Sequence, residues 1–211
     1  MRDGTKMKTV RRGRPRTFDE RLVLDQITDL FWHRGLAGTS LDAISTATGL
    51  ARPSLYTAFG NKEAMYRASF RNFVARVDAE MTDIVQSPGS VQSVLLRIFD
   101  VLVRLYTHEH SQRGCFVLCT ATAAASENAD IRGALRDMLE HVDSRFTRVL
   151  EQAKHRNDLS PDTDVPALGA VLAAISHTIA VRARAGITAE ELRALANAMV
   201  PVVMGPYLHP G

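Results

Sequence analysis

Residues 51–59 carry the side chains with the clearest chemical meaning in this sequence. Four of them offer hydrogen-bond donors or a methyl group: Arg52, Ser54, Tyr56 and Thr57. These are the groups with which proteins recognise base edges in the major groove of DNA. Leu55 and Phe59 are four residues apart, so on a helix they would share the opposite side and pack inward. The pattern predicts a short helix with one face for base contacts and one face for packing.

A helix of this kind must be held by neighbouring elements, and the preceding sequence predicts them. Apolar residues recur every three to five positions over 17–34, which indicates an amphipathic helix that Gly35 ends. Thr39 and Asp42 resemble a capping box for a second, short helix that stops at Gly49. Two short helices joined by a glycine-containing turn are typical of a helix-turn-helix module.

Basic residues flank the predicted module on both sides. Lys62 begins the next predicted helix, where its charge and the free N–H groups of the first turn could hold a DNA phosphate. Residues 1–16 contain seven basic residues and one acidic residue. Their Arg-Gly-Arg-Pro core is similar to an AT-hook, in which Arg14 and Arg16 would enter a narrow A·T minor groove. A solvated tail that attracts phosphates without sequence preference is the alternative.

Helical spacing continues through the rest of the chain. We find no sustained alternation of apolar and polar residues, so strand signals are nearly absent. The sequence therefore predicts an all-α protein of about nine helices, with a helix-turn-helix domain followed by a larger helical domain. The predicted divisions are a basic arm (1–16), a DNA-binding domain (17–61) and a ligand-binding and dimerisation domain (62–211). Helices beyond the module are expected near 62–86, 90–108, 114–125, 128–156, 164–184 and 188–204.

Three stretches, in order and at fixed spacing, resemble the tetracycline-repressor (TetR) family of bacterial transcription regulators: Thr39–Ile44, Gly49–Arg52 and Leu55–Ala64. The resemblance implies that 51–59 is the recognition helix of a homodimer. It also implies that a small-molecule inducer bound in the C-terminal domain releases a palindromic operator. Ala51 departs from the pattern, because a Ser or Thr there would cap the recognition helix. The positions that match DNA-facing residues of the family are Thr39, Arg52, Tyr56, Thr57 and Lys62.

Residues 165–181 form the only long uncharged stretch, and as a helix this stretch is apolar on all sides. Its Pro, Gly, Ser, His and Thr residues make it a poor membrane span, so we predict a buried helix and no membrane contact. One side of this helix would pack on its own domain. The other side, together with the last helix of the chain, would pack on a second copy of the protein. The alternative is a core helix without a partner. The predicted dimer contacts are Ala167, Ala170, Val171, Ala174, Thr178, Leu195, Met199 and Val202.

A cavity among the helices of about 90–150 is predicted to bind a small, apolar ligand. The alternative is that the same side chains form plain core, and a lone histidine such as His177 is more often a buried, hydrogen-bonded side chain. The predicted ligand-binding residues are Phe99, Leu102, Tyr106, Cys115, Phe116, Cys119, Met138 and His177.

Cysteine and histidine chemistry offers further alternatives. Cys115 and Cys119 would share a helical face, which suggests a thiol-responsive regulator, although an unbroken helix does not favour a disulfide between them. His108, Glu109 and His110 have no recognised metal-ligand spacing, so we expect no metal and no cofactor.

The remaining function classes are limited by motifs and charge. The chain has no Gly-rich phosphate loop, no Gly-x-Ser-x-Gly elbow and no zinc-binding His-Glu-x-x-His run, so we do not expect an enzyme. No apolar leader follows the basic start, which favours a cytoplasmic location. The preferred interpretation is a repressor of double-stranded DNA sites, with an activator and a nonspecific architectural protein as alternatives.

Overall fold

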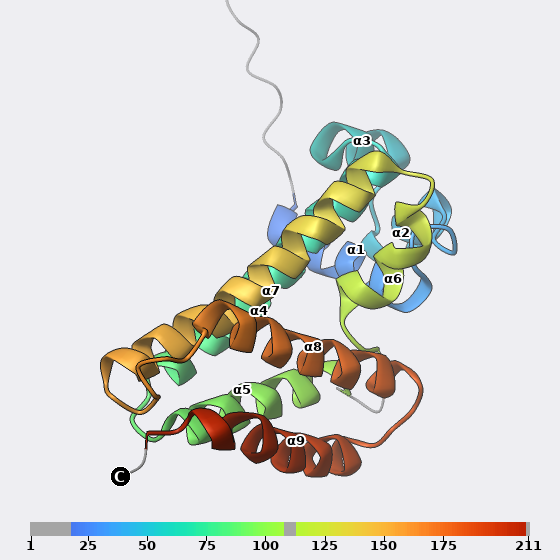
Figure 1. Cartoon of the computed structure of the whole chain (residues 1–211). Coiled ribbons are helices and arrows are strands. Elements are labelled where there is room, and N and C mark those ends of the chain that lie inside the picture. Colours follow the sequence, from blue (N-terminus) through green and yellow to red (C-terminus); the bar gives the residue numbers. More distant parts are fainter. Residues whose placement is uncertain (1–17, 108–112, 210–211) are drawn as a thin grey trace, which may run out of the picture.

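The computed structural model of the chain describes residues 18–107 and 113–209, and this part contains nine α-helices (Figure 1). The all-α fold and the number of helices agree with the prediction. Arg14, Arg16 and the rest of the predicted basic arm lie outside the described residues, as do His108, Glu109 and His110. The helices are α1 (Glu20–Arg34), α2 (Leu41–Thr48), α3 (Arg52–Phe59), α4 (Lys62–Gln86), α5 (Val91–Tyr106), α6 (Phe116–Ala125), α7 (Ala129–His155), α8 (Val165–Arg184) and α9 (Ala189–Met204).

The first three helices and the start of α4 enclose a small apolar core. α1 begins directly after Asp19, whose carboxylate accepts hydrogen bonds from two N–H groups of the first turn. Five fully buried side chains bring the four helices together: Ile27, Phe31, Ile44, Leu55 and Met65. This core fixes the orientation of α3 relative to α1.

The cap of α2 differs from the prediction by one residue. Ser40 is the N-cap, and its Oγ accepts a hydrogen bond from the N–H of Ala43 at 3.1 Å. Thr39, the predicted cap, is buried, and its hydroxyl donates to the Gly35 carbonyl at 2.7 Å. Gly49 then ends α2 in the left-handed conformation, with φ 68° and ψ 8°.

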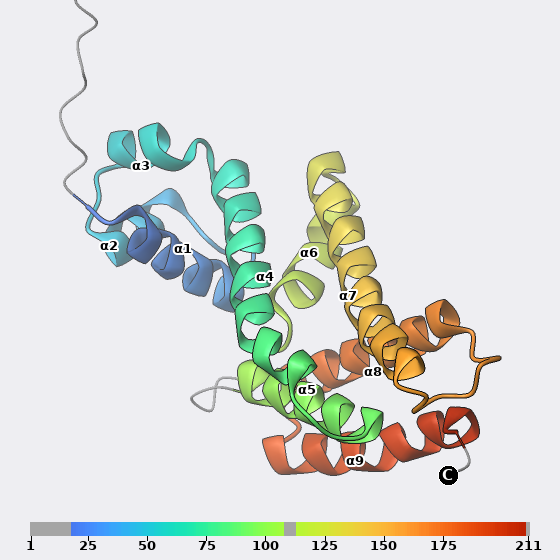
Figure 2. The same cartoon turned by 90° about the vertical axis from the view of Figure 1, so that its left-hand side faces the viewer.

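α4 belongs to both halves of the protein. Its first turns pack on α1, and it then runs to the start of α5 (Figure 2). Edge-to-face and tilted ring contacts tie α1, α4 and α6 together through an aromatic cluster: Phe31, Trp32, Tyr66, Phe70, Phe73 and Phe116. The aromatic cluster connects the helix-turn-helix to the larger domain across the predicted boundary at residue 62.

The turn before α6 passes very close to α8. Gly114 has a φ of 62°, and a Cβ added there would lie 2.5 Å from the Ala180 carbonyl oxygen and 2.7 Å from Cys119 Sγ. Trp32 of α1 donates its Nε1–H to the Gly114 carbonyl at 3.0 Å. Through this glycine, α1 and α8 contact the same short turn.

The larger domain is a layered helical bundle in which α7 packs on α8 and α5 packs on α9. Phe99 and Phe146 stack between α5 and α7 with ring centroids 5.6 Å apart. α8 is long and apolar enough to cross a membrane by length and composition, but half of its most apolar window is buried inside the protein, as in a core helix. An antiparallel bridge between Leu159 and Leu208, which the sequence did not predict, closes the chain end against the loop after α7.

Replacing Tyr66 by phenylalanine is expected to lower the free energy of unfolding by about 1 kcal/mol at neutral pH, because a buried hydrogen bond is lost. The Tyr66 hydroxyl lies 2.6 Å from Thr120 Oγ1. Burial raises the pKa of Tyr66 to about 12, so the phenol stays neutral in the folded protein while the unfolded chain ionises from about pH 10. Wild-type stability should therefore fall more steeply than that of Y66F between these two pH values. Urea titrations at several pH values measure both effects, and identical curves for the two proteins would contradict the prediction.

Candidate nucleic-acid interface

α3 lies at one end of the molecule, far from α9 (Figures 1 and 2). Leu55 is fully buried and Phe59 is half-buried against the core, so both pack inward as the sequence predicted. Ser54 and Thr57 are exposed, and Tyr56 is 47% exposed, which is high for such a large side chain. The predicted base-reading side chains are therefore all exposed, and we term the exposed side of α3 that carries them the α3 face: Arg52, Ser54, Tyr56 and Thr57.

Arg52 is held in a defined position on the α3 face. Its Nε donates to the Asp42 carboxylate of α2 at 3.0 Å, and its Nη2 contacts the same oxygen. The hydrogen bond to Asp42 raises the pKa of Arg52. Asp42 therefore connects α2 to the first turn of α3, which is a role that the sequence did not predict for it.

Two residues predicted to face DNA are directed at the protein instead. Thr39 is buried, so its side chain is not on the surface, and its hydroxyl donates a hydrogen bond to the Gly35 carbonyl. The Lys62 ammonium donates hydrogen bonds to the carbonyls of Leu36 at 3.1 Å and Thr39 at 3.2 Å. The burial of Thr39 contradicts its predicted position facing DNA, whereas the half-buried Lys62 stays a predicted phosphate contact. Both side chains stabilise the turn between α1 and α2.

The start of α3 lacks a side-chain cap, as expected from Ala51. Ala51 makes no side-chain hydrogen bond to the first turn, and Pro53 removes one N–H that would need a partner. Instead, the ion pair between Arg52 and Asp42 of α2 holds the first turn of α3 in place.

A cleft of about 740 Å³ opens between α4 and α7, in the larger domain next to the helix-turn-helix. Contacts between the two helices lie along it: Arg67 pairs with Asp130, and His141 Nε2 lies 3.0 Å from Asp78. We term this space the α4–α7 cleft. Its apolar lining comes from α4, α6 and α7: Phe70, Val74, Val117, Ala134 and Met138.

The predicted ligand-binding residues are placed mostly elsewhere. Met138 lines the α4–α7 cleft, and the other seven do not. His177 is half-buried on α8; burial lowers its pKa, and its Nε2 has no hydrogen-bond partner among the described residues. The apolar face of α5 is covered by α7, α8 and α9, so the α4–α7 cleft uses α6 and α7 of the predicted region together with α4, and not α5. Five of the predicted residues are buried in the core: Phe99, Leu102, Tyr106, Cys115 and Phe116.

The two cysteines are both free. Burial raises the pKa of Cys115 to about 11, and burial also raises the pKa of the half-buried Cys119. Both groups are therefore protonated near neutral pH, and the thiol is the less reactive form. Within 18–107 and 113–209, no cluster of three or more His, Cys, Asp or Glu residues could hold a metal ion.

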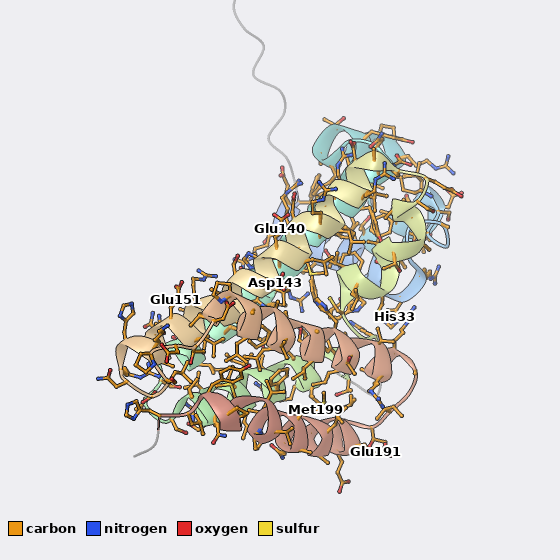
Figure 3. All side chains as sticks on the ribbon, viewed as in Figure 1. His33, Glu140, Asp143, Glu151, Glu191 and Met199 are labelled. Atoms are coloured by element: carbon orange, nitrogen blue, oxygen red, sulfur yellow. The ribbon has the colours of Figure 1, made fainter. Side chains whose placement is uncertain are left out.

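One side of α8 and α9 is apolar and exposed. Val171 of α8 is 46% exposed and Val202 of α9 is 76% exposed. Met199 lies on α9, which packs beside α8 (Figure 3). We term this surface the α8–α9 face. The structure places all eight predicted dimer residues on the exposed or half-buried side: Ala167, Ala170, Val171, Ala174, Thr178, Leu195, Met199 and Val202.

Two family models match the chain. The model described as "Bacterial regulatory proteins, tetR family" matches residues 23–69, which include α2 and α3. The model described as "Tetracyclin repressor-like, C-terminal domain" matches residues 93–199, which is half of the chain.

Individual relatives match over nearly the whole length. The chain is 30% identical to the HTH-type transcriptional repressor ComR of Escherichia coli (strain K12), over 92% of this chain and 93% of ComR. A cysteine mutant of the TetR-family regulator CifR, solved with a 26-bp operator, has a TM-score of 0.82 at 28% identity and covers 89% of this chain and 98% of its own. A regulator from Cytophaga hutchinsonii shares the fold with a TM-score of 0.77 at 22% identity, over 90% of this chain and 95% of its own. The chain therefore belongs to the TetR family of helix-turn-helix transcriptional regulators, a family of non-enzymatic proteins.

Proposed function

We propose that this protein is a dimeric repressor that acts in the cytoplasm, binds a palindromic operator and is released from it by a small-molecule inducer. The observation that carries the proposal is the exposed α3 face at the end of the molecule, in a fold whose relative CifR was solved on operator DNA. The name of ComR supports repression over activation.

The α8–α9 face supports the dimer. An exposed apolar surface on two adjacent helices is the usual basis of a four-helix contact across a two-fold axis. Two copies joined in this way present two α3 helices. A two-fold dimer with its recognition helices about 34 Å apart fits a palindrome whose half-sites lie one helical turn apart.

The α4–α7 cleft supports release by a ligand. One of its walls is α4, whose first turns pack on α1 and directly follow α3. A molecule that separates α4 from α7 would break the contact between Arg67 and Asp130 and move the start of α4. A differential affinity of this kind typically gives about 1–3 kcal/mol of coupling, which is roughly a 5- to 150-fold loss of operator affinity.

Selection of bound genomic fragments by the purified full chain, followed by footprinting, tests the proposal. We expect two protected half-sites related by a palindrome, with centres about one helical turn or a multiple of it apart. Protection that overlaps a promoter supports repression. Protection upstream of the polymerase contact region would indicate an activator, and protection without sequence preference would contradict the proposal.

A further inference from the structure

A second hollow continues the α4–α7 cleft toward the far end of both helices. It measures about 360 Å³ and shares Asp78 and His141 with the cleft. We term it the polar pocket, because most of its lining side chains are hydrogen-bond donors: Thr82, Gln86, His141, Arg145, Arg148 and Gln152.

Arg145 is the unusual residue of the polar pocket. Its side chain is only 7% exposed, although it carries a permanent charge. One Nη donates to Asp78 at 2.5 Å, while Nε is buried and has no hydrogen-bond partner among the described residues. A buried cationic N–H without a partner is costly, and a bound water or anion is one of the explanations for such a group in native proteins.

The charges of the polar pocket leave an excess of positive charge. Asp78 is its single acidic residue, and it is shared between Arg145 and His141. Burial alone would raise the pKa of Asp78, but hydrogen bonds from His141 and Arg145 outweigh it and lower the pKa, so Asp78 is ionised. Arg145 and Arg148 together therefore exceed Asp78 by one charge.

Other acidic groups on α7 do not cancel this excess inside the pocket. Glu140, Asp143 and Glu151 lie along α7 (Figure 3), and none of them lines the polar pocket. Arg148 is exposed at the pocket edge, and its Nε makes only a long bond of 3.4 Å to the Ser144 carbonyl. Its Nη groups are thus available to an incoming anion.

We propose that the polar pocket binds the carboxylate of an organic acid whose apolar body lies in the α4–α7 cleft. A guanidinium offers paired donors that match a carboxylate, and the apolar lining next to it suits a hydrocarbon chain. The inference rests on the proposed release by a small molecule and names the class of that molecule: an amphipathic acid rather than a neutral or cationic compound.

Isothermal titration calorimetry on the full chain with three ten-carbon probes tests this inference: decanoate, decan-1-ol and decylamine. The probes share one apolar chain and differ in the charge of the head group. We expect decanoate to bind at least tenfold more tightly than decan-1-ol, and decylamine to bind more weakly than decan-1-ol. Equal affinities, or a preference for decylamine, would overturn the assignment of an acid.

Substitutions in the polar pocket should change the preference for decanoate over decan-1-ol. They should not change what the shared apolar chain contributes to the affinity. R148Q removes an exposed charge and should reduce the ratio of decanoate to decan-1-ol affinity by about threefold or more. R145M should abolish the preference, and R145K should restore part of it. The matched control is R136Q, which removes an exposed arginine of α7 outside the pocket and should leave the ratio unchanged. An unchanged ratio in R148Q would contradict the proposal even if R145M does not fold.

The A134W variant separates this inference from the proposed function, because a tryptophan at this position fills the α4–α7 cleft. If all probes bind the wild type equally and A134W abolishes their binding, the cleft is a ligand site and only the acid assignment is wrong. If no probe binds, or if A134W binds them like the wild type, both the acid assignment and the cleft as inducer site are wrong.

Discussion

A174R is expected to convert the protein from a dimer to a monomer, with an apparent mass that falls from twice 23.2 kDa to 23.2 kDa. Ala174 lies on the exposed apolar side of α8, so the arginine is solvated in the monomer. In a two-fold contact it would bury two like charges at once, and the effective penalty is several kcal/mol per ion. Light scattering coupled to gel filtration measures the mass. Operator affinity should fall with it, because a monomer reaches one half-site only.

The matched control for this prediction is A79R, which places the same side chain at an exposed alanine of α4, away from α8 and α9. We expect A79R to remain a dimer with the thermal stability of the wild type. A174R that keeps the dimer mass while folding normally would show that the α8–α9 face is not the interface.

Y56A is expected to abolish sequence-specific operator binding. Tyr56 is the largest exposed side chain of the α3 face, and loss of a base-reading contact costs about 1–3 kcal/mol per half-site. Because a dimer loses the contact twice, the expected decrease in affinity is about 30-fold to 10⁴-fold. Fluorescence anisotropy with the selected operator and with a scrambled duplex, at one fixed salt concentration, measures the specific and nonspecific affinities.

The stability of Y56A decides how its loss of binding is interpreted. Tyr56 is half-exposed, so thermal unfolding should change little, and Y207A provides the same substitution at another exposed tyrosine. Specific binding by Y56A at wild-type affinity would show that the α3 face does not read DNA. Unfolding of Y56A would show that Tyr56 belongs to the core.

The helix-turn-helix could be predicted from sequence because its signals are local. Gly49 and Pro53 mark the turn and the start of α3 within a few residues, and the spacing of Leu55 and Phe59 identifies the packed side. The start of α9 carries another local motif, a capping box of Thr188 and Glu191. Each of these features depends on neighbours within one or two helical turns.

The errors concern contacts between distant segments. Thr39 and Ser40 are both good caps, and the fold of the preceding turn decides that Ser40 caps α2. Lys62 makes a contact that the sequence did not predict, with the carbonyl of Leu36, which is 26 residues away. The α4–α7 cleft depends on which helices pack as neighbours, and no periodicity within a single helix contains that information. The sequence could therefore identify apolar faces but could not say which of them enclose a cavity.

The length of α4 has a consequence for how small a ligand-induced change can be. A helix of 25 residues is about 37 Å long, and α3 is connected to its first residue. A tilt of about 5° around its far end displaces the first turn by roughly 3 Å, close to the rise of one base pair, about 3.4 Å. In a two-fold dimer the first turns of both α4 helices move together. A rotation too small to disturb the packing of the bundle is therefore enough to shift the two α3 helices out of register with the grooves of the duplex.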